Sequence, residues 1–143
     1  MSTIKVDTYL TRGGASEIAI DKLKGVTAAG SMLVVGEGGT TTTNLQQGLA
    51  KAWCNYKTAS TFVNNDSFNV AGVTDAGAGR CKIVFTNVFS NDKFASTGLS
   101  GVGHGQYSLN GQDTNLADHI TYNGSNAATD SNENTMVAHG DLA

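Results

Sequence analysis

The chain has 143 residues and a formal net charge of −3, from 9 lysines and arginines against 12 aspartates and glutamates. This length fits a single domain that buries a modest core. Its 18 glycines, lack of proline and 15% charged residues favour strands and turns over helices. No basic patch that would neutralise phosphates is visible in the sequence, so we expect no nucleic-acid partner.

The start of the sequence, residues 1–5, lacks the apolar segment of a signal peptide. The longest apolar runs, such as residues 31–35, are strand-sized, whereas a membrane span needs about 20 apolar residues. We therefore expect synthesis in a cytoplasm, no use of the usual secretory route and no membrane insertion.

In chain order, residues 1–45 are predicted to form an extended arm with short strands, and residues 46–143 a compact domain. The arm alternates apolar and polar residues in brief segments at 4–8, 17–21 and 32–35, which glycines separate. Strands this short are not stable alone, so something must cover their apolar faces. The globular domain would do so if the arm is an ordinary pair of packed hairpins. We favour the alternative, in which neighbouring copies cover them.

The contacts between copies, or between a copy and a larger particle, are expected to use the large apolar side chains of these segments. The single tryptophan has the largest apolar surface in the chain and is expected to anchor either the core or an interface. The predicted oligomer or particle interface comprises Ile4, Val6, Ile18, Ile20, Leu33, Val35 and Trp53.

A polar hinge at residues 40–44 precedes a short helix, which we expect between Asn44 and Lys51. Asn44 can cap this helix, because its side chain can accept a hydrogen bond from an unpaired backbone N–H of the first turn. Gly48 weakens the helix. No extension beyond Lys51 is expected.

The remaining chain shows short alternating segments divided by turn residues. Cys81, Ile83 and Phe85, for example, fall on one side of a strand, and Phe68 and Val70 on one side of another. Residues 73–79 are rich in turn formers and predict a hairpin connection, and loops are expected around Gly111 and Gly124. Seven or so short strands at a spacing of roughly 10–15 residues predict an antiparallel β-sandwich, jelly-roll-like domain. The expected strands are 53–56, 67–70, 81–85, 93–97, 106–109, 119–122 and 135–139.

The two cysteines and three histidines are candidates for chemistry. Cys54 and Cys81 lie on predicted strands and are expected to be buried free thiols, with a disulfide as the alternative. His104, His119 and His139 have no second histidine or cysteine at the spacing of metal ligands. We expect them to be surface or packing residues, and we expect no metal site.

Other short motifs also lack the parts that chemistry requires. Residues 130–134 alternate oxygen-bearing side chains, but the glycine that a calcium loop needs next is Thr135. Residues 36–39 lack the lysine and the hydroxyl residue of a phosphate loop. No serine lies in a nucleophile-elbow pattern, and no carboxylate pair stands out. The chain is therefore predicted not to be an enzyme, with no catalytic residues and no cofactor.

Six blocks are spread along almost the whole chain: STIKVDT at 2–8, VVGEGGTTTTNLQQG at 34–48, KAW at 51–53, DSFNV at 66–70, TDAGAG at 74–79 and HGDLA at 139–143. Together these blocks resemble small virion structural proteins of marine tailed bacteriophages, a family labelled as tail-fibre or virion structural proteins. The chain departs from the family at Cys54 and Cys81, where an apolar or aromatic residue is usual, and residues 99–134 match only loosely.

The resemblance implies a non-enzymatic component of a virion, made in the cytoplasm of the host bacterium and oligomeric, most simply a homotrimer. Its partners would be other copies of itself, capsid or tail proteins, and a glycan of the host surface. Two positions on the particle stay open. A tail fibre or knob would use the arm to join its copies, whereas a capsid decoration (cement) protein would lay the arm over the capsid lattice.

The alternative function is a stand-alone carbohydrate-binding β-sandwich module that recognises a host surface. Aromatic and amide side chains in the loops of residues 99–134 would then face the receptor. The candidates are Tyr107, Asn110, Asn115 and Tyr122. For the tyrosines, and for Tyr56, core or interface packing is the favoured role.

Overall fold

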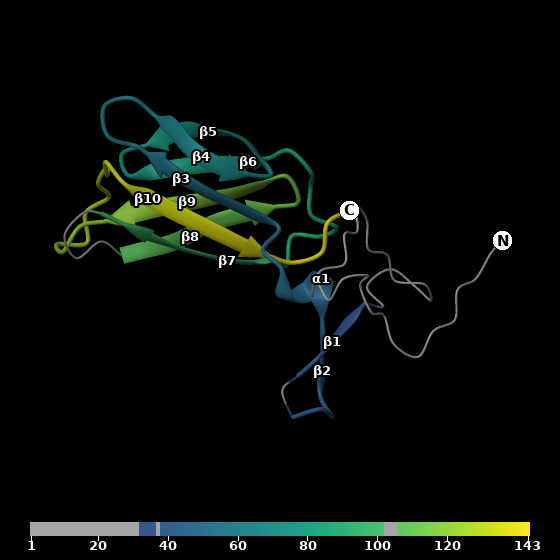
Figure 1. Ribbon diagram of the computed structural model, residues 1–143. Helices are drawn as coiled ribbons and strands as arrows, with labels where there is room; N and C mark the ends of the chain where they lie inside the picture. Colours follow the sequence, from purple (N-terminus) through teal and green to yellow (C-terminus); the bar gives the residue numbers. More distant parts are fainter. Residues whose placement is uncertain (1–31, 37, 102–105) are drawn as a thin grey trace, which may run out of the picture.

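The computed structural model describes residues 32–36, 38–101 and 106–143, with residues 106–110 described by their strand pairing. Ile4, Val6, Ile18 and Ile20 of the predicted interface therefore lie outside the described residues. The described chain is mainly β and antiparallel, as the sequence predicted (Figure 1). Its elements are β1 (Leu33–Val35), β2 (Thr42–Asn44), α1 (Leu45–Gly48), β3 (Ala52–Lys57), β4 (Val63–Phe68), β5 (Val70–Gly77), β6 (Arg80–Phe85), β7 (Ala95–Ser100), β8 (Gln106–Asp113), β9 (Leu116–Tyr122) and β10 (Asn134–His139).

Two four-stranded sheets form the body of the molecule. One has the strand order β4-β3-β10-β7 and the other β5-β6-β9-β8, and neighbouring strands are antiparallel in both. The first and last strands of the body, β3 and β10, lie side by side at the centre of the first sheet. The arrangement is β-sandwich-like, because both sheets turn one face toward a shared core.

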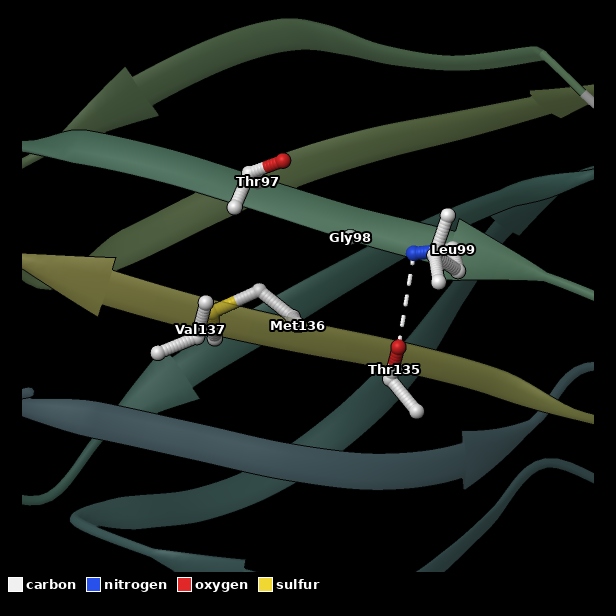
Figure 2. Close-up of a pocket in the computed structure, with 6 residues that line it drawn as sticks. All are labelled: Thr97, Gly98, Leu99, Thr135, Met136 and Val137. Atoms are coloured by element: carbon white, nitrogen blue, oxygen red, sulfur yellow. Dashed lines mark hydrogen bonds between the residues drawn. The ribbon is translucent and has the colours of Figure 1, made fainter.

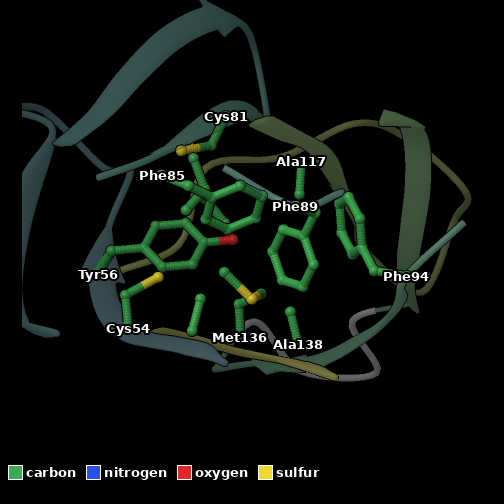
Figure 3. Packing of buried hydrophobic residues seen from close by; sticks show 11 residues of the cluster. Cys54, Tyr56, Cys81, Phe85, Phe89, Phe94, Ala117, Met136 and Ala138 are labelled. Carbon is green, nitrogen blue, oxygen red and sulfur yellow. The ribbon is translucent and has the colours of Figure 1, made fainter. Parts of the chain in front are cut away.

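Along the central strands, residues buried in the core alternate with residues that face outward, as expected for strands with one buried face. Cys54 and Tyr56 of β3 are buried, and so are Cys81 of β6 and Met136 of β10 (Figure 3). Burial of every second residue on β3, β6 and β10 confirms the strand predictions there. The full cluster is Ala52, Cys54, Tyr56, Cys81, Ile83, Phe85, Phe89, Phe94, Ala117, Met136 and Ala138.

Three phenylalanines close one end of the core. The rings of Phe89 and Phe94 stack at a centroid distance of 4.2 Å. Phe85 meets both edge-on, at 4.9 Å from Phe89 and 5.5 Å from Phe94. Stacked and edge-on pairs are the favoured arrangements of aromatic rings, so these contacts add to the stability of the core.

The predicted helix is confirmed as α1, which is short and ends before Lys51. Asn44 is its N-cap, and the Asn44 side chain accepts a hydrogen bond from the backbone N–H of Gln47 at 3.1 Å. β1 and β2 form a separate two-stranded hairpin, which extends from α1 beyond the end of the two sheets (Figure 1).

Residues 67–70 do not form one strand, which corrects the sequence prediction. β4 ends at Phe68, and Asn69 adopts a left-handed φ of 57° before β5 begins in the other sheet. The Asn69 side chain donates to the carbonyl of Lys51 at 2.9 Å and accepts from the backbone N–H of Asn87 at 2.7 Å. Phe68 and Val70 therefore do not share a face. Val70 packs on the core, and Phe68 is exposed.

The hairpin connection expected at 73–79 is confirmed in place but is shorter than predicted. β5 runs to Gly77 and pairs with β6, and the turn contains only Ala78 and Gly79. The loop expected around Gly111 is wrong, because Gly111 lies inside β8, where the register shifts between Leu109 and Gly111 in a bulge. Strand pairing overrides the turn preference of glycine there.

Candidate functional site

The hairpin β1–β2 presents its apolar residues to solvent. Leu33, Val34 and Val35 are 56%, 50% and 59% exposed and pair with Asn44, Thr43 and Thr42. A two-stranded hairpin is marginally stable at best in water. This hairpin therefore gains stability from any partner that covers it, and it includes Leu33 and Val35 of the predicted interface.

A second apolar surface lies on the outer side of the sheet β4-β3-β10-β7. Trp53 pairs with Phe68 on one side and with Val137 on the other, and Val137 pairs with Thr97. Because the buried residues of β3 and β10 alternate with Trp53 and Val137, this row points away from the core. We call the surface the Trp53 face, formed by Phe68, Trp53, Val137, Thr97, Thr135 and Leu99.

The Trp53 face contains a hollow of about 350 Å³ between β7 and β10 (Figure 2). Its floor is the paired backbone of Gly98 and Met136, and its walls come from the residues on either side of that pair. Leu99 is 77% exposed, and its backbone N–H donates to Thr135 Oγ1 at 3.3 Å. The hollow is therefore shallow, open and lined mainly by methyl groups.

The outer side of the other sheet has a different character. Arg80 of β6 donates two parallel hydrogen bonds to Asp118 of β9, from Nε at 2.9 Å and from Nη2 at 2.6 Å. These bonds hold the pKa of Arg80 above its ordinary value. Lys82 lies beside Asp118 in the strand register. The apolar residues that β6 and β9 place on this side, Val84, Leu116 and Ile120, are half-buried. Trp53, Phe68 and Leu99 are exposed, so the Trp53 face is the better candidate for contact with another molecule.

The structure divides the described part of the predicted interface between two surfaces. Leu33 and Val35 lie on the hairpin, whereas Trp53, 39% exposed, lies on the sheet. The sequence analysis missed Phe68, Leu99 and Val137 as companions of Trp53. Only the strand register brings them together, and the one sequence signal was their alternation within single strands.

The predicted receptor-facing residues do not gather at one place. Tyr107 and Asn110 belong to β8, and Asn115 lies in the turn between β8 and β9. Tyr122 is the last residue of β9, at the end opposite to Asn115. Tyr107 pairs with Thr121 next to it. Asn115 and the two tyrosines are thus at opposite ends of the sheet.

Ser96 and His119 are the described pair that most resembles reactive groups. Ser96 Oγ and His119 Nε2 lie 2.8 Å apart, and the bond connects β7 of one sheet to β9 of the other. A serine bonded to a histidine is two parts of a nucleophilic site. His119, however, is only 1% exposed, and the carboxylate of the adjacent Asp118 bonds Arg80. The geometry favours a structural bond between the sheets.

Both cysteines are buried free thiols, as the sequence predicted. Burial, with a smaller contribution from Cys81, raises the pKa of the Cys54 thiol to about 12. Burial likewise raises the pKa of the Cys81 thiol to about 12. Since the thiolate is the nucleophile and the metal ligand, neither cysteine is set up for reaction at neutral pH.

Over 32–36, 38–101 and 106–143, no group of three or more histidines, cysteines, aspartates or glutamates is placed to hold a metal ion. Asp130, of the calcium-like segment, accepts a hydrogen bond from the backbone N–H of Gly79 at 2.7 Å. No helix within the described ranges is long and apolar enough to cross a membrane.

No protein-family model, curated protein or solved structure matches this chain. The virion role implied by the sequence blocks stays a prediction. The described residues offer two exposed apolar surfaces, the hairpin and the Trp53 face, as its candidate sites.

Proposed function

We propose that this chain is a non-enzymatic structural protein on the surface of a bacteriophage virion, which assembles as a homotrimer through its N-terminal arm. The observation that carries the proposal is the hairpin β1–β2, where Leu33, Val34 and Val35 are all at least half exposed. Three large aliphatic side chains in succession stay in water unless another surface covers them.

The size of the hydrophobic effect supports this function for the hairpin. Fully burying one valine or leucine side chain contributes about 1.5–3 kcal/mol. Three such side chains, each at least half exposed in one copy, supply on burial part of the free energy that ordering a short hairpin costs. The end of the arm that the structure describes is therefore suited to association and poorly suited to stand alone.

The body fits the same proposal. We take its two sheets as a β-sandwich of the jelly-roll-like kind, supported by their shared core and by the pairing of β3 with β10. Such a body would face outward on the particle as a fibre knob or as a capsid decoration. Its partners would be copies of itself, neighbouring capsid or tail proteins, and a glycan of the host surface.

Incorporation into particles tests this function. We expect the full-length chain carrying Leu33→Ser, Val34→Ser and Val35→Ser to be incorporated at least about tenfold less than the unchanged chain, because each 1.4 kcal/mol of lost association energy is tenfold in affinity. Removal of residues 1–40 should have the same effect. Purified particles are compared by quantitative immunoblotting against the major capsid protein.

A matched control distinguishes the effect of losing the hairpin surface from the effect of losing any exposed apolar side chain. Val63 is a valine at the start of β4, on the body, with 40% exposure. Val63→Ser should leave incorporation unchanged, and all variants should keep the melting temperature of the body. Normal incorporation of the chain with three serines would contradict the assembly role of the hairpin.

The second candidate, a carbohydrate-binding module, is favoured by one observation. Trp53 and Phe68 lie side by side on an exposed sheet face, and Asn55 and Asp66 form the next row. Aromatic faces beside amide and carboxylate groups suit the binding of a sugar. A glycan array with the full chain, repeated with Trp53→Ala, separates this function from assembly.

A further inference from the structure

We propose that the Trp53 face receives residues 17–21 from the arm of a neighbouring copy. The inference rests on the proposed function, because it names the surface that the assembling arm occupies. Neither the body of a second copy nor the chain's own arm is the proposed occupant.

The described chain begins near the end of the sheet at which Trp53 lies. The carbonyl of Met32 accepts a hydrogen bond from the backbone N–H of Leu45 at 2.9 Å, which ties the start of the hairpin to α1. Lys51, just after α1, donates its backbone N–H to the carbonyl of Ala138 at 2.8 Å. Trp53 and Val137 are close neighbours of these residues in the chain. The arm thus joins the body at the end of the sheet that contains the paired residues Phe68, Trp53 and Val137.

The length of the arm allows it to reach another copy. Thirty-one residues precede Met32. At about 3.3 Å per extended residue they span up to about 100 Å, and Ile20 lies within about 40 Å of Met32. The exposed side chains of Leu33, Val34 and Val35 favour a second copy at this same end of the molecule, because a neighbour there would cover them. That neighbour's Trp53 face is then within reach.

Charge favours an arm over a second body as the occupant. Residues 1–31 contain four lysines and arginines against three acidic residues, a net charge of +1. Residues 32–143 contain the other five against nine, a net charge of −4. Two bodies of −4 that meet face to face repel each other, whereas the arm carries no net negative charge. Within the arm, Glu17 and Asp21 of the docking segment are balanced by Lys22 and Lys24 directly after it.

The spacing of the apolar residues also fits. In an extended segment Ile18 and Ile20 point to the same side, about 7 Å apart, and Glu17 and Asp21 point to the other side. Residues i and i+2 on β7 and β10 repeat at that same distance around the hollow of about 350 Å³. Two isoleucine side chains can therefore enter between the walls while the acidic residues stay in water.

Disulfide trapping between two full-length chains tests the proposal. One chain carries Ile18→Cys and a small tag that changes its mass, and the other carries Val137→Cys. Oxidation of the mixture should give a heterodimer of defined mass on a non-reducing gel, about tenfold faster than the same mixture with Lys82→Cys in place of Val137→Cys. Lys82 is an exposed residue on the opposite outer side, and the native cysteines are buried.

The alternatives give different results. A chain with both Ile18→Cys and Val137→Cys, diluted into unchanged chain, should lose its crosslinked product as dilution increases. A crosslink within one chain that survives dilution would assign the Trp53 face to the chain's own arm and overturn the proposal. Equal trapping at Lys82→Cys, or no trapping at all, would overturn it too. If trapping fails while the three serines in the hairpin still lower incorporation, the virion role stands and this docking site falls.

Discussion

Replacing Gly79 with alanine is expected to lower the free energy of unfolding of the body by about 3 kcal/mol or more, because two costs add. Gly79 has a left-handed φ of 65°, which only glycine adopts without penalty. A Cβ at this position would lie 2.4 Å from the backbone nitrogen of Thr129 and 2.6 Å from the carbonyl oxygen of Thr121. Both atoms are backbone, so neither moves aside without disturbing β9 and the loop after it.

Gly79 also connects three parts of the fold. It lies in the turn between β5 and β6, its N–H donates to Asp130 Oδ1 at 2.7 Å, and its carbonyl accepts from Thr121 N at 2.8 Å. A side chain here separates the turn from the segment that covers it. Loss of those hydrogen bonds adds to the strain.

Denaturant unfolding of Gly79→Ala and Gly72→Ala measures the effect. Gly72 lies on β5 without a left-handed φ, and a Cβ added there would meet no atom within 4 Å. Gly72→Ala should therefore change stability by at most about 0.5 kcal/mol. A Gly79→Ala chain as stable as Gly72→Ala would show that the close packing of this turn is absent in solution.

The stability of the body is expected to fall by about 3 kcal/mol as pH decreases from about 6.5 to about 4, on account of His119. Burial lowers the pKa of His119 from 6.5 to about 4 in the folded protein. Between these values the unfolded chain binds a proton at His119 that the folded chain does not. The contribution of neutral His119 to the free energy of unfolding is therefore fully present above pH 6.5 and is lost progressively as pH falls toward 4.

Unfolding free energies at several pH values, for the unchanged chain and for His119→Gln, test this prediction. Glutamine does not titrate, so the slope between pH 4 and 6.5 should decrease even if its absolute stability is lower. His139→Gln is the control, because His139 lies on β10 and leaves His119 unchanged. An equal pH slope in all three proteins would assign the acid sensitivity to carboxylates instead.

The sequence predicted the strands whose alternation is strong. Cys81, Ile83 and Phe85 were expected on one side of a strand, and all three are buried there. β4 and β5 were harder, because the polar sequence of β4 and the glycine, threonine and aspartate of β5 lack apolar alternation. Pairing with β3 and β6 supplies the backbone hydrogen bonds that decide their structure.

The candidate surfaces were only partly predictable. Leu33 and Val35 were found because the alternation of their short segment had no local partner. Predicting the Trp53 face required the strand register, because Leu99 pairs with Thr135, which is 36 positions away in the chain. The sequence pattern predicts Asn69 as an ordinary strand residue, so it misses the change of sheet that exposes Phe68.

The most direct test of assembly through the arm is the mass of the full-length protein in solution, measured by light scattering over a range of concentrations. The chain has a mass of 14.7 kDa, and we expect a homotrimer of three times this mass. The chain with Leu33→Ser, Val34→Ser and Val35→Ser should dissociate at concentrations where the unchanged chain does not. A monomer at every concentration, or the same mass for both proteins, would contradict association through the arm.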